Sequence, residues 1–126
     1  MNIVDSSGWL EYFDGPNADF FAPAVENVSE LLVPSISLYE VFGRVLQQRT
    51  EGDALQAVAT MMQGEVIALD ERVALDAARL SLELKMPMAD SVILTTARLH
   101  GAVVWAQDSD LEGVEDVEYI EKKEYK

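Results

Sequence analysis

Four acidic residues, Asp5, Glu40, Asp90 and Asp108, stand at positions of this 126-residue chain where chemistry commonly occurs. Each follows an apolar run with strand character or falls in the first turn of an expected helix. In an α/β sheet, the carboxyl ends of strands and the first turns of the following helices share one edge, where ligands bind. Carboxylates that meet there repel one another unless a hard divalent cation lies between them. The pattern therefore favours metal-dependent chemistry on a phosphate ester.

The first two acids also have structural interpretations. Asp5 is a good N-cap for a helix that begins at Ser6, because Asp side chains accept hydrogen bonds from the amides of a first helical turn. Ser37 and Glu40 have the spacing of a capping box, in which Glu40 would bond back to the Ser37 amide. Arg44 lies one turn beyond Glu40, so an exposed ion pair between them is a further alternative.

The later acids are open to similar alternatives. Asp90 lies in the first turn of a mostly apolar helix, where the helix dipole favours an acid whatever its function. Asp108 and Asp110 directly follow a strand, and turn geometry favours Asp there. Two acids two residues apart at a strand exit also suit a hard cation. No single acid is decisive, and the prediction depends on all of them falling at one expected edge.

The composition limits the classes of partner. Net charge is −14, from 23 acids against nine Lys and Arg residues. On charge alone, nucleic acid is a disfavoured ligand and a basic protein is a favoured one. A metal ion in an acid cluster would invert the sign locally. The absence of cysteine excludes disulfides and thiolate zinc sites, and the apolar fraction of 49% predicts a globular protein.

The hydrophobic pattern predicts one α/β domain over residues 1–121 and a charged tail over residues 122–126. Strands that alternate with helices indicate βαβ units and a mainly parallel sheet. The expected strands are 2–4, 31–33, 66–69, 102–105 and 117–120. The expected helices follow Asp5, run over 18–27, open near Ser37, resume after a break at 51–53, and span 71–84 and 89–100. No signal peptide or membrane span is found, so we expect a cytoplasmic protein without a membrane partner.

Four segments together resemble the PIN domain, and closely the VapC-type toxins of toxin–antitoxin pairs: residues 3–7, 35–41, 88–97 and 103–111. They occur in the family's order and with family-like spacing. The resemblance implies a three-layer α/β/α fold with a central, mainly parallel sheet flanked by helices. It also implies a homodimer, hydrolysis of RNA, and inhibition by a cognate VapB-like antitoxin.

Residue by residue, the resemblance makes Asp5, Glu40, Asp90 and Asp108 the catalytic acids that bind Mg²⁺ or Mn²⁺. It adds Asp110 as a further metal-binding acid and Ser6 as a small polar residue of the substrate site. Arg44 is our candidate for a phosphate contact, with ion pairs to Glu40 or to an antitoxin carboxylate as alternatives. The chain departs from the family at Ala106, where Thr is usual, and at Leu111, where Phe is common. A missing Thr hydroxyl would remove a hydrogen bond that orients Asp108.

We therefore predict a metal-dependent endoribonuclease that is inhibited by an antitoxin. The alternative is a catalytically weak or inactive PIN-fold binding protein, which the Ala106 and Leu111 departures support. A haloacid-dehalogenase-like phosphatase fits poorly, because it would place a second Asp two residues after Asp5. A receiver domain would need a Lys near the last strand, and a histidine-based ribonuclease would need more than His100.

Overall fold

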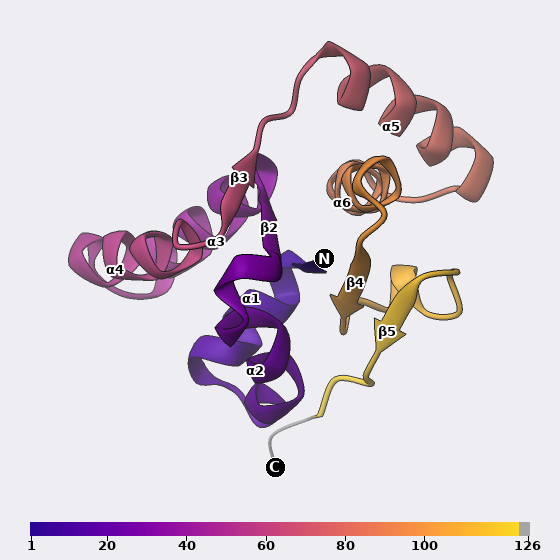
Figure 1. The fold of residues 1–126 in the computed structure, drawn as a ribbon. Coiled ribbons are helices and arrows are strands. Elements are labelled where there is room, and N and C mark those ends of the chain that lie inside the picture. The colour runs from indigo at the N-terminus through magenta and orange to yellow at the C-terminus, as the bar shows by residue number, and fades with distance from the viewer. Residues whose placement is uncertain (124–126) are drawn as a thin grey trace.

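Five parallel strands form one sheet in the computed structural model, which describes residues 1–123 (Figure 1). The spatial order is β3-β2-β1-β4-β5, so the chain starts in the middle of the sheet and builds outward on both sides. The expected strands are confirmed with ends shifted by one or two residues. Their bounds are β1 (Asn2–Val4), β2 (Leu31–Pro34), β3 (Glu65–Ile67), β4 (Val103–Ala106) and β5 (Val117–Tyr119).

Successive strand residues point to opposite faces of the sheet and divide the core into two layers. Ile3 belongs to the cluster under α5 (Glu71–Leu84) and α6 (Met88–His100), and its neighbour Val4 belongs to the cluster under the other helices. Both side chains are fully buried. The sheet thus separates two helical layers, which confirms the predicted three-layer α/β/α class (Figure 1).

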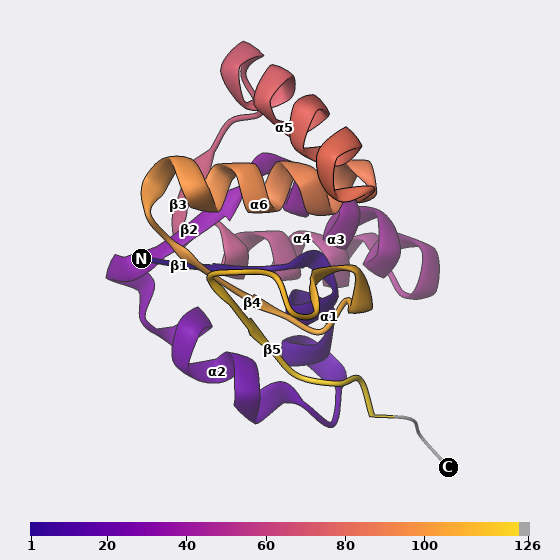
Figure 2. The same ribbon diagram turned by 90° about the vertical axis from the view of Figure 1, so that its right-hand side faces the viewer.

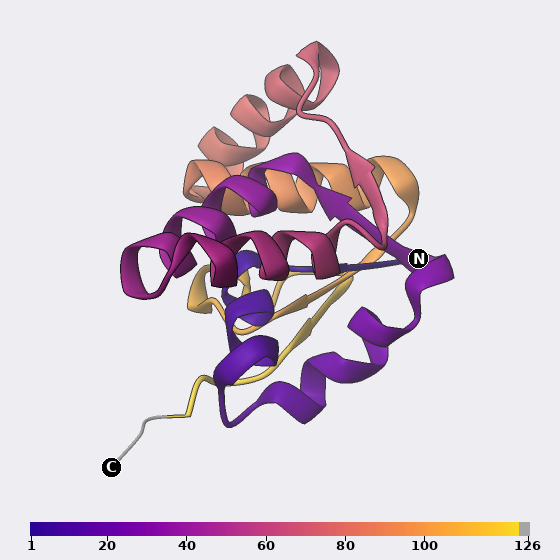
Figure 3. The ribbon, with the colours of Figure 1, turned by 90° about the vertical axis from the view of Figure 1, so that its left-hand side faces the viewer.

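Four helices from the first half of the chain pack around one of these clusters: α1 (Ser6–Asp14), α2 (Ala18–Glu26), α3 (Ser35–Gln48) and α4 (Glu51–Met61). Figure 3 shows α3 and α4 side by side. The expected break at 51–53 is wrong, because Thr50 and Asp53 form a reciprocal capping box that begins α4. The interruption falls at Arg49 and Thr50 instead.

On the opposite face, α6 lies directly against the sheet and α5 packs outside α6 (Figure 2). Residues 90–97 of α6 are all buried, as expected for the inner helix of a layer. Gly101 ends α6 in a left-handed conformation, with φ of 62°, which confirms the predicted stop. Two short 3₁₀ segments, η1 (Val28–Glu30) and η2 (Ser109–Leu111), had no counterpart in the sequence prediction.

No helix within residues 1–123 is both long and apolar enough to cross a membrane. Part of the expected charged tail, residues 124–126, lies outside the described residues. Lys122 and Lys123 are described, and they line a surface cleft together with residues of α1, α3 and α4.

Candidate active site

The parallel sheet brings the predicted acids to its carboxyl edge. Asp5 follows β1 and Asp108 follows β4, and these two strands are hydrogen-bonded neighbours. The backbone amide of Asp5 continues this pairing by donating to the carbonyl oxygen of Trp105 at 3.0 Å. Asp90 occupies the first turn of α6, and Glu40 lies six residues into α3. The chain topology therefore delivers acids from four distant segments to a common region.

Asp90, Asp108 and Asp110 form the tightest group of carboxylates. One oxygen from each lies within 4.8 Å of the others. Asp90 is buried, Asp108 is half-buried and Asp110 is exposed, so the group opens to solvent on the Asp110 side. Burial first, and the charge of Asp108 second, raise the pKa of Asp90 to about 8. The protein thus holds a carboxyl group that stays protonated near neutral pH until a cation offsets its neighbours.

Asp5 lies behind this group and serves two functions. Its Oδ1 accepts a hydrogen bond from the Gly8 amide at 2.6 Å, which is the predicted N-cap of α1. Its Oδ2 accepts from the Asp108 amide at 3.3 Å. Burial raises the pKa of Asp5 to about 7, against the opposing effect of the Gly8 and Asp108 amides. The cap and the acid cluster are therefore compatible, because the two oxygens face different partners.

Glu40 is not part of a capping box, and that interpretation is wrong. Helix α3 begins directly after β2 with Pro34 at its cap position, and no side chain caps it. Glu40 Oε1 instead accepts a hydrogen bond of 2.6 Å from the hydroxyl of Ser6, in the first turn of α1. This contact joins Glu40 to the residue next to Asp5. The Ser37 hydroxyl is fully buried and has no hydrogen-bond partner among the described residues.

Arg44 is exposed and lines a cleft of about 780 Å³, whose lining includes none of the five candidate acids. No ion pair joins it to Glu40 within residues 1–123, so the predicted local pair is absent there. The cleft gathers four of the nine Lys and Arg residues of the chain: Arg44, Arg49, Lys122 and Lys123. Arg49 is paired with Asp14 at 2.7 Å. Ser7 and Gln107 also line the cleft, and they are the sequence neighbours of Ser6 and Asp108.

The two departures from the family pattern lie in the core. Ala106 and Leu111 are both fully buried and belong to the cluster under α6. Leu111 therefore packs in the core at the position where the family commonly has Phe. Ala106 leaves no hydroxyl beside Asp108, but its neighbour Gln107 is buried in a polar network that sequence reasoning did not identify. The partners of Gln107 are too distant in sequence to give a local signal.

The fold and the acids define a class of α/β protein with carboxylates at the carboxyl edge of a parallel sheet. The chain belongs to the PIN domain family, because the family model matches residues 3–117. This match confirms the resemblance found in the sequence. A search of curated proteins found no match.

Several solved structures have the same fold as this chain. A chain of a toxin–antitoxin complex from Klebsiella pneumoniae is 22% identical, with a TM-score of 0.75 over 94% of this chain and 96% of that chain. DNA-bound VapBC from Salmonella typhimurium contains a chain 18% identical, with a TM-score of 0.71 over 95% and 96%. Mycobacterium tuberculosis VapC20, described as a Sarcin-Ricin loop cleaving toxin, is 14% identical, with a TM-score of 0.73 over 93% and 98%.

Proposed function

We propose that residues 1–121 form a single metal-dependent endoribonuclease domain of the VapC type, which hydrolyses RNA phosphodiester bonds and is inhibited by a cognate VapB-like antitoxin. The observation that carries this proposal is the carboxylate group of Asp90, Asp108 and Asp110, backed by the buried Asp5. Structural relatives described as toxin–antitoxin proteins support the antitoxin, and one described as a loop-cleaving toxin supports the nuclease.

The donor set fits Mg²⁺ or Mn²⁺. Every candidate ligand is a carboxylate oxygen, which is the donor type that hard divalent cations prefer. Burial first, and the nearby charges of Asp108, Asp5 and Asp110 after it, raise the pKa of Asp90, and a bound cation would offset those charges. Asp90, Asp108 and Asp110 would hold the ion, with Asp5 and Glu40 completing its surroundings. When bound, such an ion would polarise the phosphate and lower the pKa of a water molecule.

The protein's own residues supply position and substrate binding. The Asp108 amide fixes the orientation of Asp5, and the Ser6 hydroxyl fixes that of Glu40. Ser6 also borders the place where a scissile phosphate would sit. Arg44, Lys122 and Lys123 would contact RNA phosphates along the cleft. Glu11, Asp14 and Asp53 also line the cleft, so these cations give it only a small local excess of positive charge in a chain whose net charge is −14.

Exposed apolar side chains support a protein partner. Leu82 is 83% exposed, Tyr39 is 80% exposed and Met88 is 70% exposed. Tyr39 precedes Glu40, and Met88 lies two residues before Asp90, so two of them flank the acids in sequence. We propose that a second copy of this chain and the antitoxin cover such side chains. Size measurement of the purified chain, alone and with the antitoxin, tests both associations.

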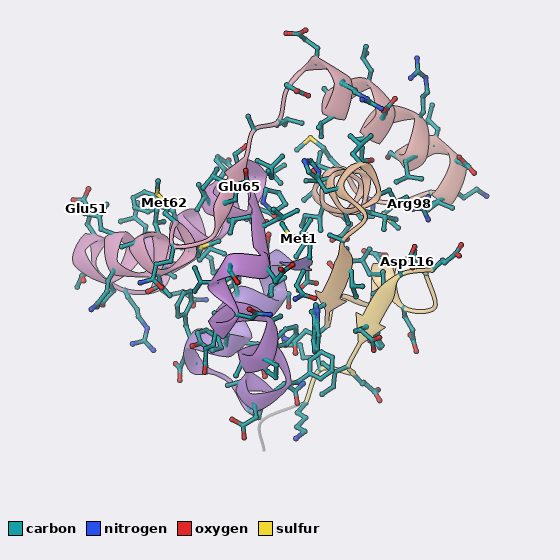
Figure 4. All side chains as sticks on the ribbon, viewed as in Figure 1. Met1, Glu51, Met62, Glu65, Arg98 and Asp116 are labelled. Atoms are coloured by element: carbon teal, nitrogen blue, oxygen red, sulfur yellow. The ribbon has the colours of Figure 1, made fainter. Side chains whose placement is uncertain are left out.

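Cleavage of a mixed, structured RNA by the antitoxin-free protein tests the nuclease directly. We expect cleavage with Mg²⁺ or Mn²⁺, none with EDTA, and none by Asp90→Asn. The matched control is Glu65→Gln, which changes an exposed acid at the start of β3, at the opposite edge of the sheet (Figure 4). A folded protein that cleaves no RNA with either metal would support the alternative of an inactive PIN-fold binding protein. The missing hydroxyl at Ala106 is the observation that keeps this alternative open.

A further inference from the structure

Gln107, the residue before Asp108, is buried and hydrogen-bonded through its side chain on three sides. Its Nε2 donates to Glu11 Oε2 at 3.1 Å and to the Ser7 hydroxyl at 3.2 Å. Its Oε1 accepts from Asn17 Nδ2 at 3.2 Å. Burial of an amide is costly unless its polar atoms are paired, so these contacts define one orientation of the side chain.

Glu11 is the unexpected member of this network, because it is a buried acid on α1 that forms no ion pair within residues 1–123. Only 7% of the residue is exposed. Its Oε1 accepts from the Asn17 amide at 2.8 Å, and its Oε2 accepts from Gln107. Gly15 leaves space for this carboxyl group, because a Cβ at Gly15 would collide with Glu11 Cδ. The hydrogen-bond donors of the buried Glu11 carboxyl group are the amides of Asn17 and Gln107. Movement of either donor would leave a buried polar oxygen unpaired, so the network constrains both of them.

The network also reaches the C-terminal segment. Asn17 Nδ2 donates to the carbonyl oxygen of Glu121 at 3.0 Å. The next two residues are Lys122 and Lys123, which line the cleft. One set of side chains therefore connects α1, the end of β4 and the segment that carries two of the cleft's cations.

The position of Gln107 explains what this network does for the site. Asp108 is half-buried, its Oδ1 accepts a hydrogen bond from the Asp110 amide at 3.0 Å, and the buried Leu111 anchors η2 on its C-terminal side. The Asp108 amide is tied to Asp5 on one side. On the other side, the side-chain hydrogen bonds of Gln107 hold the residue that directly precedes Asp108. Ala106 has no hydroxyl that could form a further hydrogen bond here. The Gln107 side chain is therefore the first polar group before Asp108 in the sequence that can hold the backbone in place.

We propose that Glu11 and Gln107 are positioning residues, whose buried hydrogen bond fixes the Asp108 carboxylate in the metal site. The pair acts on the metal site through the backbone of Asp108; both residues also line the cleft, so metal affinity and Asp108 exchange, and not RNA binding, report the positioning role. The expected effect on metal affinity rests on the proposed function. The position of Asp108 itself can be measured in the metal-free protein.

Exchanging the two side chains gives a sharp test. In Glu11→Gln alone, two side-chain amides face each other across the former hydrogen bond. In Gln107→Glu alone, two carboxylates face each other there and repel. The double variant Glu11→Gln/Gln107→Glu keeps the net charge and every hydrogen bond described here, with donor and acceptor exchanged. In a double-mutant cycle, restoration by the double variant shows that the contact matters, and not either residue alone.

Two readouts distinguish positioning from stability. The first is NMR hydrogen exchange of the Asp108 amide in the metal-free protein, which reports local opening at that residue. The second is Mn²⁺ affinity by calorimetry. The control is Asn2→Ala, which removes the acceptor of the 3.0 Å hydrogen bond from Trp105 Nε1 at the other end of β1. It destabilises the same pair of strands without touching the network.

We expect each single variant to speed Asp108 exchange and to weaken Mn²⁺ binding by about tenfold, and the double variant to restore both. Asn2→Ala should lower the melting temperature and leave both readouts unchanged. Single variants that fold and leave Asp108 exchange unchanged would overturn the inference, as would a double variant that restores nothing. A wild-type protein that binds no Mn²⁺ would refute the proposed function, and Asp108 exchange would then decide the positioning role alone.

Discussion

The backbone amide of Asp108 donates a hydrogen bond to the carboxylate of Asp5, 103 residues earlier in the chain, at 3.3 Å. The first acid of the site thus orients the loop that carries the last one. Since β1 and β4 are neighbours in the sheet, this contact extends the strand pairing by one step beyond the strands themselves. The edge at which we propose a metal site is therefore held by the sheet itself and by this one hydrogen bond beyond it.

Metal affinity should rise with pH. The pKa is raised to about 8 for Asp90 and to about 7 for Asp5, and carboxylates must be ionised to bind a cation. Below the pKa of Asp90, affinity should fall by about tenfold for each pH unit. Calorimetry with Mn²⁺ in buffers of different ionisation enthalpy should detect proton release. An affinity that stays constant from about pH 6 to about pH 8 would contradict the elevated pKa values.

The metal-free protein should lose stability as pH rises. Both pKa values are raised above the ordinary 3.8, so the folded state binds more protons than the unfolded state between about pH 4 and pH 8. The free energy of unfolding therefore decreases across that window. Urea unfolding with EDTA should show the decrease, and added Mn²⁺ should reverse it at the alkaline end.

Asp90→Asn should weaken the dependence of stability on pH, because it removes the contribution of Asp90 and leaves that of Asp5. The variant should be more stable than the wild type at about pH 8 without metal, and it should gain nothing from Mn²⁺. Glu65→Gln, which removes an equal charge from an exposed position, should keep the wild-type dependence. Identical curves for the two variants would attribute the effect to overall net charge and not to the site.

Gly8 should tolerate no side chain, because it packs against the residues that hold Asp5. A Cβ there would lie 2.6 Å from Phe21 Cε1, 2.7 Å from Asp5 Oδ1 and 2.8 Å from Val4 Cγ1. Gly8→Ala should destabilise the protein by about 1–3 kcal/mol and weaken metal binding. Gly43 provides the contrast, since a Cβ on this α3 residue meets nothing within 4 Å. Gly43→Ala should stabilise by about 0.5–1 kcal/mol, and equal effects of the two changes would contradict the packing argument.

The Ser6 hydroxyl should matter through Glu40. Ser6→Ala removes the donor of the 2.6 Å hydrogen bond to Glu40 Oε1 and leaves every acid in place. We expect metal affinity and RNA cleavage to fall by about tenfold. Ser29→Ala, at an exposed position on η1, is the matched control. An unchanged metal affinity in Ser6→Ala would show that Glu40 does not need this orientation.

RNA binding should depend on the cations of the cleft. In an Asp90→Asn background, which we expect to bind without cleaving, Lys122→Ser/Lys123→Ser should reduce the slope of log affinity against log salt by about 1.5, since two cations are removed. Arg44→Gln should weaken binding in the same direction. Arg72→Gln/Arg79→Gln is the control, because both arginines lie on α5 and are paired with Asp76. Equal losses from the two pairs of substitutions would contradict a specific path along the cleft.

Much of the fold could be predicted from the sequence, because strand and helix periods are local properties. The strands of the sheet and the acids at their ends follow from apolar runs and from the edge rule for parallel sheets. The helix start with a capping side chain was identified correctly at Asp5. The outer ends of strands were less certain, since hydrogen bonding with neighbours decides where a strand stops.

The contacts that hold the site together could not be predicted in this way. Ser37 and Glu40 fit a local capping pattern, but the real partner of Glu40 is Ser6, which lies 34 residues away. The contact between Gln107 and Glu11 spans 96 residues. Such pairs depend on how helices pack against the sheet, and no periodicity in the sequence encodes them. In the sequence, nothing distinguishes the buried Glu11 of α1 from an ordinary surface acid.

The central claim is that Asp90, Asp108 and Asp110, with Asp5 behind them, form a divalent cation site. The most direct measurement is a crystal structure of the protein grown with Mn²⁺ at about pH 8, with anomalous diffraction recorded at the manganese edge. We expect an anomalous peak at about 2.1 Å from carboxylate oxygens of Asp90 and Asp108, which is absent in Asp90→Asn crystals grown in the same way. A wild-type map with no peak at these acids, or with the peak on surface carboxylates alone, would contradict the account.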